Sequence, residues 1–111
     1  MSQRLPYNTL LDYLLMAETR PGMFFGSCCV DVVRYHLDGW NMHRKMTEDN
    51  DDFAEYFFEE FHGFVESHYS DNRTIGWNGL VRENTVSDND GFQIFMSLVR
   101  QFASEFESKR I

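Results

Sequence analysis

The apolar residues of this sequence recur at the three- and four-residue spacing that places side chains on one face of a helix. The spacing is clearest near the end of the chain, where the repeat runs through Phe92, Phe95, Met96, Val99, Phe102, Ala103 and Phe106. An earlier stretch repeats it through Phe53, Phe57, Phe61, Phe64 and His68. No segment alternates apolar and polar residues convincingly over the length of a strand. The pattern predicts an all-α fold, a compact bundle of about four to six helices.

Capping residues and proline set the ends of the first predicted helices. Asn8 or Thr9 can cap a helix that ends before Pro21, because the residue before a proline disfavours the helical region. Residues 23–26 then form an aromatic connector, which we expect to fill the core between two helices. Ser27 can cap a second helix, in which Gly39 indicates a bend or the close approach of another helix. The apolar stripe of this helix consists of Cys29, Val32, Val33, His36, Leu37 and Trp40.

The second half of the chain carries similar signals. Basic residues at 43–45 suit the end of the second helix, where the helix dipole is negative. Residues 47–50 are predicted to separate this helix from the next. A polar loop at 70–74 precedes a shorter element around 75–81. Two glycines within this element make regular structure there less favourable. Ser87 opens the last helix as a capping box, with Asp90 in place of the usual Glu or Gln.

The stretch from Glu48 to Tyr69 combines the phenylalanine repeat with an unusual density of acid. Seven carboxylates fall within its first fourteen positions, and it contains no Lys or Arg. Asp51, Asp52 and Glu55 lie near the start of the predicted helix, where the helix dipole favours negative charge. Glu59 and Glu60 lie too far along the helix for that explanation. They form either a solvated face or part of a binding surface.

The composition supports one folded domain over residues 1–111. The chain has 111 residues, 42% of them hydrophobic, which suffices for one buried core. The formal net charge of -8 argues against nucleic acid as a direct ligand, because phosphate binding depends on Lys and Arg. A basic protein is the more suitable partner, although acidity also serves solubility.

Cysteine usage and hydropathy predict a cytoplasmic protein. Cys28 and Cys29 are adjacent, and vicinal cysteines on regular backbone do not reach the geometry of a disulfide, so we expect reduced thiols. The first residues lack the charged and apolar regions of a signal peptide, and no apolar run is long enough to span a membrane.

The sequence contains no pattern that identifies an enzyme, a cofactor or a metal site. Glu48–Asp52 lacks the alternating ligands and central glycine of a calcium loop. His62 and His68 are six residues apart and therefore lie on different helix faces. No nucleophile motif or phosphate-binding glycine loop is present. We therefore expect a binding protein, with a small acid–base enzyme that uses His36, His43, His62 and His68 as a distant alternative.

Two segments resemble a group of small bacterial proteins. The turn RPGMFFG at residues 20–26 and the helical motif HLDGW at residues 36–40 are similar to an Arg-Pro-x-Met-aromatic-aromatic-Gly turn and a Leu-Asp-Gly-aromatic helix in that group. Gly76-Trp77 and the phenylalanine-rich last helix fit as well. Proteins of this kind are immunity proteins of bacterial toxin systems, including contact-dependent growth inhibition. The resemblance implies a small cytosolic partner that binds and blocks a toxin domain.

Many such toxins are nucleases, whose active sites are basic because they hold phosphates. The resemblance and the acidity together lead us to expect an inhibitor that covers such a cleft. The expected toxin-binding residues are Glu48, Asp49, Asp51, Asp52, Glu55, Glu59 and Glu60, with Tyr56 and Tyr69 as secondary contacts. The alternative is an acidic nucleic-acid mimic or regulatory module that binds a basic host protein.

Overall fold

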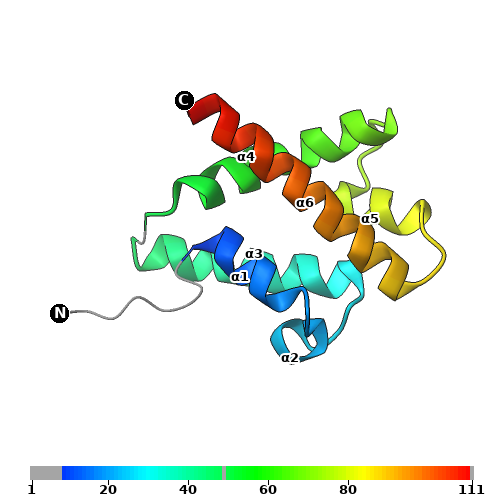
Figure 1. The fold of residues 1–111 in the computed structure, drawn as a ribbon, viewed down its shortest axis with the longest axis horizontal. Coiled ribbons are helices and arrows are strands. Elements are labelled where there is room, and N and C mark those ends of the chain that lie inside the picture. The colour runs from blue at the N-terminus through cyan, green and yellow to red at the C-terminus, as the bar shows by residue number, and fades with distance from the viewer. Residues whose placement is uncertain (1–8, 49, 111) are drawn as a thin grey trace.

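The computed structural model describes residues 9–48 and 50–110, and the fold is all-α (Figure 1). The described residues form six helices and no strand. Their bounds are α1 Leu10–Ala17, α2 Pro21–Phe25, α3 Val30–Met46, α4 Asp52–Tyr69, α5 Gly76–Glu83 and α6 Asp88–Arg110. No helix in this described part is long and apolar enough to cross a membrane.

The long helix α6 organises the bundle. It runs obliquely across the other elements and contacts α1, α3, α4 and α5 (Figure 1). The predicted repeat of α6 is confirmed, since every member is buried. Ser87 also caps this helix as expected: its Oγ accepts a hydrogen bond from the Asp90 N–H, and the Asp90 carboxylate accepts one from the Val86 N–H.

Aromatic side chains fill the space between α4, α5 and α6. Phe61 lies at the centre: it stacks on Phe57 with 4.5 Å between ring centroids, and its ring meets the edges or faces of Trp77, Phe95 and Phe102 at 5.4 to 5.9 Å. Such edge-to-face pairs stabilise a core beyond the burial of their area. The abundance of phenylalanine is therefore explained by the core. Trp77 is buried within it.

The first helices differ in detail from the prediction. Thr9 caps α1 as expected, through a hydrogen bond from the Asp12 N–H. Residues 23–26 were predicted to be an irregular connector, which is wrong. Pro21, at the first helical position, starts the short helix α2, which includes Phe25. Phe25 of this helix is buried, as expected of a core-filling residue. Cys29, rather than Ser27, is the cap residue of α3.

The predicted apolar stripe of α3 is only partly buried. Val33 and Leu37 are in the core, whereas Val32 is 40% exposed and His36 is exposed. A Cβ built on Gly39 meets no atom within 4 Å, so no helix of the described chain approaches closely there. The core-facing side of α3 is therefore rotated away from the predicted stripe.

The first turn of α5 requires glycine. Gly76 has φ +79°, and an added Cβ would collide with the Arg34 guanidinium and lie 2.8 Å from Asn78 Oδ1. We expect Gly76→Ala to lower the free energy of unfolding by about 2 kcal/mol, because left-handed backbone costs an L residue about 1–2 kcal/mol before any clash. Gly63 in the middle of α4 is the matched control, since it has open space around it. Gly63→Ala should raise stability by up to about 1 kcal/mol through helix propensity. Urea unfolding of both variants tests this, and equal effects would contradict it.

Candidate partner-binding surface

The outward face of α4 carries a row of carboxylates. Asp52, Glu55 and Glu59 follow one another at three- and four-residue spacing, and all three are exposed. Glu66 continues the row one heptad later and is half-buried. Glu66 is not among the residues predicted from the sequence, although its seven-residue spacing from Glu59 indicates the same helix face. Because α4 contains no Lys or Arg, the row forms one negative surface.

Most arginines are already paired with carboxylates elsewhere. Within the described residues, ion pairs join Arg34 to Asp38, Arg44 to Glu55, Arg73 to Asp71 and Glu83, Arg82 to Asp31, and Arg100 to Glu18. Glu59 and Glu60 take part in no ion pair among these residues. The excess negative charge of the chain is therefore concentrated partly on the middle of α4.

Glu55 differs from its neighbours because a buried arginine lies beneath it. Arg44 Nη1 donates to Glu55 Oε1 at 3.0 Å, and the Arg44 side chain is 5% exposed while that of Glu55 is 56% exposed. Arg44 Nη2 also donates to Asn41 at 2.8 Å. The basic end of α3 was predicted to complement the helix dipole, and the structure adds that one of its cations links α3 to α4. Part of the Glu55 charge is therefore neutralised from within.

Asp51 does not belong to the exposed acidic surface. Its side chain is 7% exposed, and its oxygens accept hydrogen bonds from the Leu10 N–H at 2.7 Å and the Ala54 N–H at 3.0 Å. It caps α4 and ties the start of α1 to it. Glu48 is exposed, in a left-handed conformation with φ 56°. Asp49 lies outside the described residues.

A groove between α4 and α6 borders the acidic row. It has a volume of about 630 Å³, and Glu60 and Glu105 contribute carboxylates to its walls. Phe64, which is partly exposed, provides apolar surface in it above the buried ring of Phe102. The groove therefore combines apolar contact area with negative charge.

Lys109 shows how this groove receives a cation. Its ammonium donates to the Tyr56 hydroxyl at 2.7 Å and lies 5.3 Å from the ring centroid. The hydrogen bond with Tyr56 is the main cause that raises the Lys109 pKa, and the charges of Glu105 and Glu60 add to it. The ammonium form is thus favoured at this position. Tyr56 is held flat against Phe102, with 5.0 Å between ring centroids.

Tyr69 lies at the C-terminal end of α4, one turn beyond Glu66 and far from Asp52, Glu55 and Glu59. Thirteen residues separate it from Tyr56, which corresponds to roughly 20 Å along a helix. It is half-buried, and burial is the main cause that raises the pKa of its hydroxyl, followed by the negative charge of Asp90. The structure therefore places Tyr56 among Asp52, Glu55 and Glu59, and leaves Tyr69 apart from these three carboxylates.

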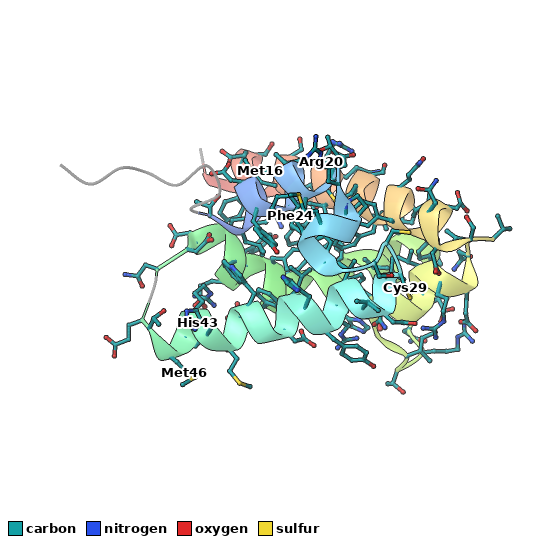
Figure 2. The ribbon with its side chains drawn as sticks, turned by 90° about the horizontal axis from the view of Figure 1, so that it is seen from below. Met16, Arg20, Phe24, Cys29, His43 and Met46 are labelled. Atoms are coloured by element: carbon teal, nitrogen blue, oxygen red, sulfur yellow. The ribbon has the colours of Figure 1, made fainter. Side chains whose placement is uncertain are left out.

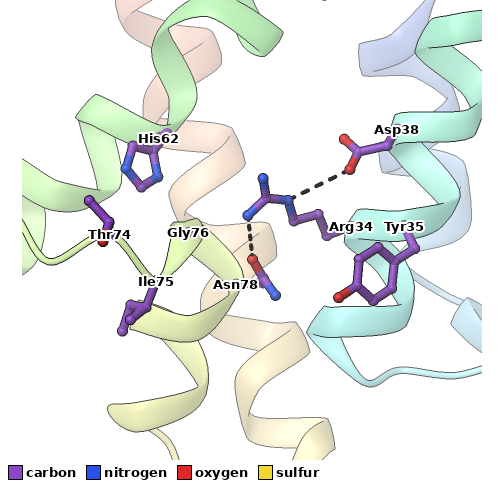
Figure 3. Close-up of a pocket in the computed structure, with 8 residues that line it drawn as sticks. All are labelled: Arg34, Tyr35, Asp38, His62, Thr74, Ile75, Gly76 and Asn78. Carbon is purple, nitrogen blue, oxygen red and sulfur yellow. Dashed lines mark hydrogen bonds and ion pairs between the residues drawn. The ribbon is translucent and has the colours of Figure 1, made fainter.

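A second polar cleft lies between α3, α4 and α5 (Figure 3). Hydrogen bonds at this cleft join α3 to α5. Asn78 is buried and accepts a hydrogen bond from Arg34 Nη1 at 2.7 Å, while its amide donates to Asp31. Arg82 also donates to Asp31. His62 and Thr74 complete the lining of the cleft on the side of α4 and the following loop. This network fixes the position of α5 against α3.

The histidines are dispersed over the molecule. His36 stacks parallel to Tyr13 and shares a 2.8 Å hydrogen bond with its hydroxyl, and its exposure shows that its predicted place on the core-facing stripe is wrong. His62 pairs with Glu66 at 3.2 Å, and His68 packs against Tyr69. Over residues 9–48 and 50–110, no group of three or more His, Cys, Asp or Glu side chains is arranged to hold a metal ion.

The two cysteines are free and half-buried at the start of α3.

Comparison of the chain with models of protein families, with curated proteins and with solved structures finds no match in any of the three. The surface on α4 is therefore interpreted from its own chemistry.

Proposed function

We propose that this chain is an immunity protein that binds a cognate bacterial toxin domain and neutralises it. The toxin is a nuclease of the RNase type with a basic active-site cleft, and the chain acts in the cytoplasm by covering that cleft. The observation that carries the proposal is the exposed carboxylate row of α4, a helix without Lys or Arg, which adjoins a groove that has both carboxylate and aromatic side chains in its walls. The resemblance of residues 20–26 and 36–40 to immunity proteins supports the same function.

The proposed interface consists of the acidic row and the groove beside it. Asp52, Glu55 and Glu59 present charge along α4, and such fields accelerate the encounter with a basic partner. Glu60 and Glu105 line the groove, where carboxylates suit an arginine or lysine side chain, as the position of Lys109 over the Tyr56 ring illustrates. The rigid core beneath α4 preorganises this surface, which lowers the entropy lost on binding.

Charge reversal at Glu59 of the row and at Glu60 of the adjoining groove tests the placement of the interface. We expect Glu59→Lys/Glu60→Lys to weaken binding of the purified toxin domain at least about tenfold at physiological salt, mainly through slower association, because steering is lost and repulsion is introduced. Both side chains are exposed, so folding should be retained. The measurement is surface plasmon resonance at several salt concentrations, with circular dichroism as the check on folding.

The matched control is Asp12→Lys/Asp88→Lys, which makes the same change in charge at exposed positions on α1 and α6. Its effect on affinity should stay below about threefold. Equal weakening by both variants would show that net charge alone matters, and unchanged affinity of the α4 variant would remove the interface from this face.

The alternative function, an acidic module that binds a basic host protein, uses the same surface. It would replace the proposal if the chain bound that protein and did not inhibit the toxin encoded beside its gene.

A further inference from the structure

Helix α3 presents an apolar stripe to the outside of the molecule. The stripe consists of Val32, Tyr35, Gly39, Met42 and Met46. Successive members are three, four, three and four residues apart, which is the spacing of a coiled-coil seam. At 100° per residue they fall within an arc of about 80°. The side chains of Val32, Tyr35, Met42 and Met46 are 40%, 70%, 66% and 78% exposed, respectively.

The stripe has no covering element within the described chain. The opposite side of α3 packs on the core through Val30, Val33 and Leu37. Figure 2 shows α3 along the lower edge of the molecule, with Met46 pointing away from the other helices. Methionine and tyrosine are enriched at protein interfaces, and an aligned row of them differs from scattered exposed apolar residues.

Charges beside the stripe indicate its occupant. Asp38 and Lys45 each precede a stripe residue, are one heptad apart and carry opposite charges. Residues at this heptad position meet across the interface of an antiparallel helix pair. Asp38 of one copy, which lies 3.7 Å from Arg34 of its own chain, would therefore meet Lys45 of the other, and the two-fold symmetry would form this pair twice. Met42 and Met46 line a shallow groove of about 440 Å³ together with these two charged residues.

Gly39 supports the same orientation. In the antiparallel register that pairs Asp38 with Lys45, the side chain of Met42 in one copy faces Gly39 of the other. The open space over Gly39 can accept that side chain. A parallel pair would instead place Gly39 against Gly39 and leave a gap at the centre of the seam, which costs packing energy.

We infer that this stripe is a self-association surface, through which two copies of the chain pair antiparallel along α3. In this register Tyr35 of one copy faces Met46 of the other, so the paired seam covers eleven residue steps, or roughly 17 Å, and Val32 lies beyond its end. This is short for a stable interface, so a dimer that dissociates in the micromolar range is expected. The inference stands independently of the proposed toxin, because it uses a different helix and a different partner.

Sedimentation velocity of the full chain, from about 1 µM to about 0.5 mM, tests self-association. The wild-type protein should shift from monomer to dimer within this range. Met42→Glu should weaken the dimer at least about thirtyfold, because it places a carboxylate in the seam. Met23→Glu is the matched control: Met23 is 74% exposed but lies on α2, and its replacement should leave the dissociation constant within about twofold. A wild-type protein that remains monomeric throughout, or equal effects of both variants, would overturn the inference.

Charge exchange tests the orientation. Asp38→Lys and Lys45→Asp should each weaken the dimer about tenfold through like charges across the seam, whereas the double variant should restore most of the affinity. Failure of the double variant to recover, with its helix content intact, would contradict the antiparallel pairing. If the wild type stayed monomeric while Met42→Glu reduced toxin binding, the stripe would be a toxin contact and self-association would be rejected.

Discussion

The Phe61→Ala variant is expected to lose about 4 kcal/mol of unfolding free energy, the largest effect of any single side chain considered. Truncation of a fully buried phenylalanine costs about 3–5 kcal/mol, because transfer energy is lost and a cavity remains. Phe61 is 1% exposed and contacts rings from α4, α5 and α6. A domain of this size has roughly 5–15 kcal/mol of stability, so the variant should be marginally folded at best.

Phe64→Ala is the matched control for this prediction. Phe64 lies one turn further along the same helix, is partly exposed, and contacts Phe61 and Phe102 from the rim. Its truncation should cost about 1–2 kcal/mol, since less area is buried. Guanidinium unfolding followed by tryptophan fluorescence measures both, because Trp77 packs against Phe61. If Phe61→Ala does not fold, Phe61→Leu should still fold and lose about 1–2 kcal/mol. Comparable losses at Phe61 and Phe64 would contradict the central position of Phe61.

The repeat in α6 predicted its buried face correctly because a long helix in the middle of a bundle has one continuous apolar side. The same reasoning was wrong for α3, where Val32 and His36 follow the spacing but are exposed. Two apolar rows occur on this helix, and periodicity alone does not decide which one faces the core. The choice depends on the elements that pack against α3, which local sequence does not reveal.

The acidic stretch was recognisable from sequence, but the roles of its members were not. Glu55 and Glu59 share an exposed face, as helical spacing predicts. Asp51 carries the same charge and yet lies inside, because the start of α1, forty-one residues earlier, needs an acceptor. Likewise, Arg44 is buried beneath Glu55 rather than solvated at a helix end. Counting carboxylates therefore locates a charged region and does not separate binding groups from structural ones.

Asp51→Ala is expected to lower the free energy of unfolding by about 3 kcal/mol, which is the second large effect. The loss has two parts. Removal of a helix cap typically costs about 1 kcal/mol, and a buried amide without an acceptor costs about 1–3 kcal/mol. The two carboxylate oxygens of Asp51 separate these parts, because one accepts from Ala54 within α4 and the other from Leu10 of α1.

Asp51→Ser distinguishes the two contributions. A serine hydroxyl can still cap α4 but provides no second oxygen for the Leu10 N–H, so this variant should recover about 1 kcal/mol relative to Asp51→Ala. Amide hydrogen exchange adds a local measurement: the Leu10 amide should lose protection in both variants, and the Ala54 amide only in Asp51→Ala. Asp52→Ala, at the next and exposed position, should cost less than about 1 kcal/mol. If Asp51→Ala were no more destabilising than Asp52→Ala, the carboxylate of Asp51 would not link the two helices, and it would return to the candidates for partner binding.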